Sequence, residues 1–111
     1  MTSHVSELLE NYRQAALGTA ATDSGAANRW AAQLLLCRNA LRETAEGRAG
    51  LLSLVRDVEP SVRCWAAAHC LQWAPEVAKP TLEALRDSEG PFGFDAAMTL
   101  REYEKGRLSF D

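Results

Sequence analysis

Cys64, His69 and Cys70 carry the side chains in this sequence that are best suited to zinc binding or nucleophilic chemistry. Thiolate and imidazole are common zinc ligands, and a thiol beside a histidine can act as a nucleophile. The spacing argues against both activities. Each helical residue turns the side-chain direction by about 100°, so Cys64 and Cys70 point in different directions and His69 diverges from Cys70. We therefore predict unreactive buried thiols, no metal and no cofactor.

His69 and the tryptophans Trp30, Trp65 and Trp73 allow two interpretations. A histidine inside a helical pattern is usually partly buried and hydrogen-bonded, and large aromatic residues at helical spacing usually belong to the core. The alternative is contact with a partner, because aromatic residues are enriched at interface hot spots. Trp65 is the strongest candidate among the tryptophans, since it is a large side chain in a run of alanines. Trp65 and His69 are therefore candidate partner-binding residues.

Two pairs of acidic residues occupy equivalent turns, Asp57 with Glu59 and Asp87 with Glu89. Acidic residues are favoured before helix N-termini, so one interpretation is helix capping. The alternative is an acidic ridge that docks a basic partner, since complementary charge raises the association rate. A glycosidase-like acid and base would need a cleft and one carboxylate with a raised pKa, whereas these turn residues are expected to be exposed.

Phe92 and Phe94 lie in a glycine-bearing turn before a last helix, for which Asp95 is the predicted N-cap. We expect both phenylalanines to fold back onto the core, and they are candidate partner-binding residues if a specific partner exists. The glycines of this turn do not form a phosphate loop, because that motif needs a longer glycine spacing and a following Lys-Ser or Lys-Thr.

Arginines are spread along the chain, but acidic residues are interleaved with them. We expect solvated helix faces and salt bridges within the repeats rather than a phosphate-binding surface. The 15 acidic residues exceed the 12 basic ones, and the isoelectric point is near 5.4. This balance argues against nucleic-acid binding. The arginines concerned are Arg29, Arg38, Arg42, Arg48, Arg56, Arg63 and Arg86.

The scaffold for these residues is an internal repeat. LLSLVRD at residues 51–57 returns as TLEALRD at residues 81–87, thirty positions later. The same offset pairs Asp57 with Asp87 and Glu59 with Glu89. A repeat of this length predicts one helix pair per unit, stacked as a helical solenoid.

Hydrophobic periodicity, caps and prolines predict about six helices in one domain, 1–111. Its parts are an N-terminal helix pair at 1–46, repeat units at 47–74 and 75–106, and a tail at 107–111. Ser3 is the predicted first N-cap, residues 18–25 a loop, and Gly106 the last C-cap. Pro80 predicts a kink or a late start near Lys79. The helices are expected at about 4–17, from between 24 and 27 to 46, 49–56, 60–73, 76–87 and 96–105.

Composition agrees with an all-α domain. Hydrophobic residues make up 47% of the chain, with many alanines and few β-branched residues, which favours packed helices. The three cysteines cannot all pair with one another and indicate a reducing compartment. No stretch reaches the roughly 20 apolar residues of a membrane span, and no signal peptide is evident. We therefore predict a cytoplasmic protein without membrane contact.

Residues 51–71, LLSLVRDVEPSVRCWAAAHCL, resemble a short HEAT-like (armadillo-type) repeat. Leucines of one helix precede an acidic-proline turn, a Val-Arg pair and a run of alanines. The second unit departs from this pattern, because Gly90 and Pro91 stand in its turn and Asp95 stands where a small core residue is expected. The resemblance implies a short HEAT-like solenoid.

More of the chain resembles a bacterial family of small HEAT-like proteins, the domain of unknown function 2019 family. The similar segments are VSELLENYRQAA at 5–16, PSVR at 60–63, LQWAPEVAKPTLEAL at 71–85 and DAAMTLREYEKG at 95–106. No catalytic residue transfers from this family. The resemblance implies a bacterial origin and, by association, membership among immunity proteins that accompany toxins.

These observations predict a non-catalytic protein-binding module. Its narrower form is an immunity or inhibitor protein that neutralises a bacterial toxin, with a basic toxin domain as partner. The alternative is a small regulatory or assembly module that forms a homodimer through its terminal helices. An enzyme or a nucleic-acid binder ranks last, because neither a convergent set of titratable groups nor a basic face is visible.

Overall fold

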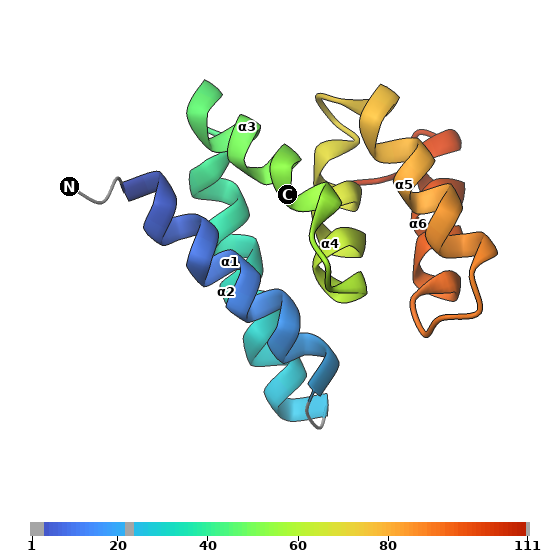
Figure 1. The fold of residues 1–111 in the computed structure, drawn as a ribbon, viewed down its shortest axis with the longest axis horizontal. Coiled ribbons are helices and arrows are strands. Elements are labelled where there is room, and N and C mark those ends of the chain that lie inside the picture. The colour runs from blue at the N-terminus through green and yellow to red at the C-terminus, as the bar shows by residue number, and fades with distance from the viewer. Residues whose placement is uncertain (1–3, 22–23, 111) are drawn as a thin grey trace. The chain divides into compact units, whose positions relative to one another are not determined.

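Helices form all the regular secondary structure in residues 4–21 and 24–110, the part of the chain that our computed structural model describes (Figure 1). The prediction of an all-helical fold is confirmed for these residues. The backbone forms two compact units, Met1–Ser53 and Leu54–Asp111. The elements are α1 (His4–Ala21), α2 (Ser24–Leu41), α3 (Ala45–Ser53), the 3-10 helix η1 (Leu54–Arg56), α4 (Pro60–Cys70), α5 (Pro75–Asp87) and α6 (Gly93–Glu104).

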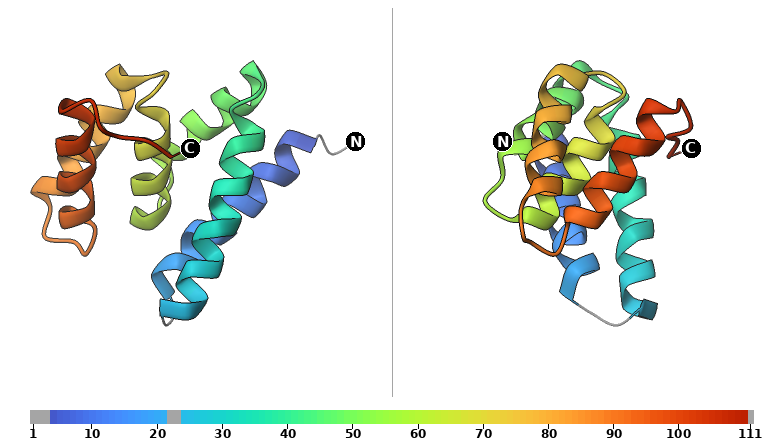
Figure 2. Two further views of the ribbon diagram at one scale, coloured as in Figure 1. Left: turned by 180° about the vertical axis from the view of Figure 1, so that it is seen from behind. Right: turned by 90° about the vertical axis from the view of Figure 1, so that its right-hand side faces the viewer.

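In the first unit, α1 and α2 lie side by side along most of their length (Figures 1 and 2). Tyr12 on α1 and Leu34 and Leu41 on α2 are buried. Helix α1 continues to Ala21 and α2 begins at Ser24, so the predicted loop at residues 18–25 is wrong at positions 18–21 and 24–25. Ser3 lies outside the described residues.

The turn between α2 and α3 differs from its prediction. The sequence pattern predicts one helix up to about residue 46, but α2 ends at Leu41 and α3 begins at Ala45. Thr44 stands before α3, and its Oγ1 accepts a hydrogen bond of 2.9 Å from the Gly47 N–H, as an N-cap does. A Cβ at position 47 would overlap the Leu41 carbonyl oxygen, so glycine permits this close approach.

The second unit packs α4 against α5 and α6 around a small apolar core. Ala66 and Ala67 on α4 are fully buried, and so is Leu82 on α5. Ala96 and Leu100 are one turn apart on α6 and face the same core. Small side chains on α4 leave room for the larger leucines of its neighbours, which explains the alanine run in the sequence.

Prolines set the starts of two helices in this unit. Pro60 and Pro75 begin α4 and α5, where a missing N–H breaks no helical hydrogen bond. The prediction for Pro60 is confirmed. Pro80 lies inside α5, which runs from Pro75 to Asp87, so the predicted late start near Lys79 is wrong. Helix α4 ends at Cys70, three residues before the predicted end.

Helix α6 begins at Gly93, with Phe92 as its N-cap residue and no side-chain cap. The predicted cap, Asp95, is instead inside the first turn. Gly106 has a φ of +71°, and its N–H donates to the Tyr103 carbonyl at 3.0 Å. The Arg107 N–H donates to the Glu102 carbonyl at 2.9 Å, which completes a Schellman motif. Gly106 therefore ends the helix, as predicted.

After α6 the chain returns toward α4 (Figure 2). The ring of Phe110 meets His69 edge to face, with centroids 4.5 Å apart. Arg107 forms two hydrogen bonds with the Glu102 carboxylate, at 3.0 and 2.9 Å. These contacts attach the tail to the helices of its own unit.

Candidate functional site

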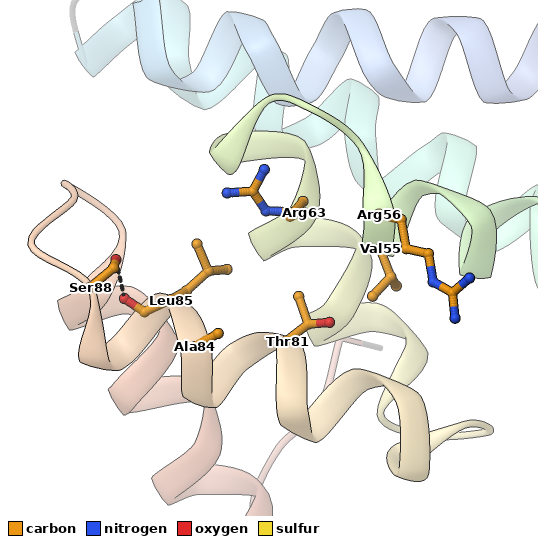
Figure 3. A pocket seen from close by; sticks show the side chains of 7 residues that line it. All are labelled: Val55, Arg56, Arg63, Thr81, Ala84, Leu85 and Ser88. Carbon is orange, nitrogen blue, oxygen red and sulfur yellow. Dashed lines mark hydrogen bonds between the residues drawn. The ribbon is translucent and has the colours of Figure 1, made fainter.

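A pocket of about 320 Å³ lies between η1, α4 and α5 in the second unit (Figure 3). We name it the Arg56–Arg63 pocket after its two charged residues. Val55 and Leu85 line it with apolar side chains, although both are almost fully buried. In Figure 3 the Val55 side chain points toward α5 and the Leu85 side chain toward α4. The other lining residues are Thr81, Ala84 and Ser88.

The backbone turn beside the pocket is held by local hydrogen bonds. Arg63 Nη1 donates to the carbonyl oxygens of Asp57 and Val58, at 2.9 and 3.1 Å. Asp57 Oδ1 accepts the Glu59 N–H at 3.0 Å. Arg63 is thus oriented by neutral acceptors, and it keeps further N–H groups because a guanidinium carries five donors.

Arg56 and Arg86 occupy equivalent positions in the thirty-residue repeat, and each precedes an aspartate. Arg86 donates to both Asp87 carboxylate oxygens, at 2.9 and 3.3 Å. This hydrogen bond lowers the pKa of Asp87. The Arg56 side chain has no hydrogen bond or ion pair with any residue that the structure describes. The expected salt bridge is therefore present in the second repeat and missing at the equivalent position of the first.

The two hydroxyl groups of the pocket already donate to helix carbonyls. Ser88 Oγ donates to Leu85 O at 2.8 Å, and Thr81 Oγ1 donates to Val77 O at 3.4 Å. None of the lining residues is acidic, and none is a cysteine or histidine. The pocket therefore offers guanidinium donors and apolar contact, which suit binding, and its walls hold no general base.

The predicted acidic ridge is a surface of mixed charge. The turn before α4 and the turn before α6 lie at the same end of the second unit (Figures 1 and 2). Glu59 and Glu89 are exposed there. Asp57 caps its own turn, while Asp87 pairs with Arg86. Asp57 thus stabilises the turn, but α4 has no side-chain cap, so the helix-capping interpretation is wrong for Asp57 and Glu59. Glu59 and Glu89 remain candidates for a partner contact.

Trp65 and His69 lie one turn apart on α4, with ring centroids separated by 5.7 Å. His69 is only 1% exposed, so the interpretation of a buried histidine holds and its ring offers no surface to a partner. Trp65 is half-buried. The sequence alone could not show whether His69 is buried, because the Phe110 ring that packs against it lies 41 residues further along the chain.

The three cysteines are buried and reduced. Burial raises the pKa of Cys70 to about 12. Burial, with a smaller contribution from Asp95, raises the pKa of Cys64 to about 11. Within residues 4–21 and 24–110, no group of three or more His, Cys, Asp or Glu side chains is placed to hold a metal ion. Because burial raises their pKa values, the Cys64 and Cys70 thiols are protonated at neutral pH.

Phe94 is 75% exposed, and Met98, one turn further along α6, is 37% exposed. The prediction that both phenylalanines fold back onto the core is wrong for Phe94. Since α6 begins at Gly93, Ala96 takes the core-facing position and Phe94 points outward. Phe92 is half-buried.

Three arginines differ from the expected solvated helix faces and salt bridges. Arg38 on α2 is fully buried, and its Nη1 donates to Asn39 Oδ1 at 2.9 Å. Arg56 and Arg63 line a pocket. The alignment of the two repeats pairs Arg56 with Arg86, so it could have singled out Arg56 for comparison. Only the three-dimensional structure shows that Arg86 forms a salt bridge with an aspartate and Arg56 does not.

No protein-family model matches the sequence, and no curated protein or solved structure is significantly similar to it. The resemblance to the domain of unknown function 2019 family therefore stays a prediction. No helix in the described ranges is both long enough and apolar enough to cross a membrane.

Proposed function

We propose that this protein is a non-catalytic protein-binding module built on a short HEAT-like helical repeat. The observation that carries the proposal is the Arg56–Arg63 pocket, where apolar surface adjoins two arginines that have no acidic partner among the described residues. The thirty-residue repeat supports the solenoid architecture. Exposed Phe94 adds an apolar contact of the kind that interfaces bury.

A narrower proposal is an immunity or inhibitor protein that neutralises a bacterial toxin in the cytoplasm. Its support is the family resemblance, the small size and the net charge of −3, which suits a basic toxin domain. The test is co-expression with the product of the adjacent reading frame, followed by size-exclusion chromatography and a survival assay. If neither a complex nor protection is observed, the narrower proposal fails.

The variant Ala84→Phe tests whether complex formation depends on the Arg56–Arg63 pocket rather than on non-specific contact with the protein surface. Ala84→Phe places a large ring at the pocket, because Ala84 is exposed and lines it. Ala40→Phe is the matched control, since Ala40 is an exposed alanine on α2. We expect Ala84→Phe to weaken the complex and Ala40→Phe to leave it unchanged. Equal loss in both variants would argue against a role for the pocket in protein binding.

Self-association is a second candidate function, and the exposed pair Phe94 and Met98 favours it. A homodimer that buries this face of α6 should dissociate on dilution, and Phe94→Ser should shift the equilibrium to monomer. Val58→Ser is the matched control, because Val58 is also an exposed apolar residue. Static light scattering over a range of concentrations measures the mass. A monomer at every concentration would eliminate this candidate.

A further inference from the structure

Residues 107–110 follow α6 as a short segment that crosses back to α4 (Figure 2). They form neither helix nor strand, and we name them the 107–110 strap. At the first residue, Arg107 Nε and Nη2 donate to the two Glu102 carboxylate oxygens at 3.0 and 2.9 Å. At the last, the Phe110 ring meets His69 with a centroid distance of 4.5 Å and an interplanar angle of 85°.

The strap joins an acidic group on α6 to aromatic rings on α4. The Cα atoms of Arg107 and Phe110 are at most about 11 Å apart, because each residue of chain spans no more than about 3.6 Å. Trp65 lies one turn before His69, with its ring centroid 5.7 Å from the imidazole centroid. We call Trp65, His69 and Glu102 the strap site. It accepts one guanidinium and one aromatic ring from the same short segment.

The contacts of the strap lie near the surface. The Arg107 and Glu102 side chains are 59% and 32% exposed, and an exposed ion pair contributes little to stability. Ser109 is exposed and Phe110 is half-buried. A segment with few buried contacts opens at a small fraction of the free energy that unfolds the core. Release of the strap would uncover the His69 ring, which is 1% exposed while the strap is in place.

We propose that the strap occupies, within its own chain, the site for a segment of a partner protein with the pattern basic-x-x-aromatic. The strap itself shows that this spacing places a guanidinium at Glu102 and a ring against His69 together. A basic segment also suits the net charge of −3. The strap acts as an internal competitor, so the partner segment binds as the strap leaves. This assignment rests on the proposed protein-binding function and adds a partner surface outside the Arg56–Arg63 pocket.

The test is an NMR titration of the full chain, labelled with ¹⁵N, with the capped peptide Arg-Leu-Ser-Phe, which has the sequence of the strap. In Phe110→Ala the ring position is open, so the peptide should shift the Trp65 indole N–H signal and the His69 and Glu102 amides. A tethered segment has an effective concentration on the order of 1 mM, and docking of one ring is worth about tenfold. The expected Kd is therefore on the order of 0.1 mM. The unsubstituted chain should bind about tenfold more weakly, because its strap competes.

Matched peptides and variants locate the interaction. The capped peptide Arg-Phe-Leu-Ser has the same composition and charge but the wrong spacing, so it should bind Phe110→Ala more weakly. Added to Phe110→Ala, Glu102→Gln should weaken binding about two- to fivefold, as for an exposed ion pair. Glu83→Gln is the matched control, because Glu83 is exposed on α5. Circular dichroism checks the fold, and Phe110→Leu, which keeps an apolar side chain, should bind the peptide with intermediate affinity.

Each outcome distinguishes a competing strap from a purely structural tail. Binding of Arg-Leu-Ser-Phe that is tighter in Phe110→Ala than in the unsubstituted chain, and tighter than that of Arg-Phe-Leu-Ser, supports the proposal. No shift of Phe110→Ala at millimolar peptide, or equal binding of the two peptides, overturns it. A dimer of the unsubstituted chain that is lost in Phe110→Ala would indicate strap exchange between two copies instead. If a protein partner binds Phe110→Ala and Glu102→Gln as tightly as the unsubstituted chain, this inference fails while the proposed function stands.

Discussion

Substitution of Gly47 by alanine tests why α2 ends at Leu41 and α3 begins at Ala45. A Cβ at position 47 would overlap the Leu41 carbonyl oxygen and would lie 2.8 Å from its carbonyl carbon. Backbone fills that space, so Gly47→Ala must displace the turn. The Gly47 N–H also donates to Thr44 Oγ1 at 2.9 Å. Displacement of the turn would break this cap.

Two opposing effects determine the sign of the change in stability. Alanine favours a helix over glycine by about 1 kcal/mol. Overpacking typically costs about 1 to 3 kcal/mol, and loss of a Thr cap costs about 1 kcal/mol more. We expect Gly47→Ala to lower the free energy of unfolding by about 1 to 3 kcal/mol. Urea denaturation followed by far-UV circular dichroism measures this quantity.

Two further variants separate the steric overlap at position 47 from the loss of the Thr44 cap. A Cβ at Gly90 would have Ser88 Oγ as its nearest atom, at 3.5 Å, so Gly90→Ala should change stability by no more than about 0.5 kcal/mol. Thr44→Ala should cost about 1 kcal/mol alone and less in the Gly47→Ala background, because the cap is already lost there. A Gly47→Ala protein as stable as the unsubstituted chain would refute the steric reasoning.

Three other predictions concern the second unit. Burial raises the pKa of Cys70 to about 12 from an ordinary 9.0, so native Cys70 should resist iodoacetamide until urea unfolds the protein. The contribution of the protonated thiol to stability should be complete below pH 9.0 and be lost as the pH rises toward about 12. Equal alkylation rates in the native and unfolded protein would contradict this prediction. Phe110→Ala removes the ring packed on His69 and should lower stability by about 1 to 2 kcal/mol, whereas an unchanged thermal midpoint would argue against a docked tail. Trp73 Nε1 is buried without a hydrogen-bond partner among the described residues, so Trp73→Phe should cost less than about 1 kcal/mol in urea denaturation, and a loss of several kcal/mol would indicate that the N–H is bonded.

The helices of this chain are largely predictable from local signals, but their ends are less so. Pro60 begins α4 and Gly106 ends α6, as the sequence predicts. The break at Leu41 was missed because Trp30, Leu34, Cys37, Leu41 and Ala45 continue one apolar spacing across the turn. Thr44 is a recognisable N-cap signal that this spacing concealed.

The candidate site was less predictable than the fold. Its arginines looked like ordinary surface residues, since acidic neighbours are available in the sequence. Arg86 does pair with the following aspartate, whereas Arg63 turns to backbone carbonyls and Arg56 pairs with no described residue. A local sequence pattern cannot choose between these partners, because the equivalent Arg-Asp pairs at the end of η1 and the end of α5 have different backbone conformations.

The sequence by itself determined the helical class, the thirty-residue repeat and the residues that start and stop several helices, because these depend on periodicity and on the backbone limits of proline and glycine. Only the tertiary structure decided which side chains are exposed. Phe110 covers His69 from the far end of the chain, and the start of α6 at Gly93 turns Phe94 outward. The Arg56–Arg63 pocket likewise needs α5 beside η1 and α4, a contact between residues about thirty positions apart.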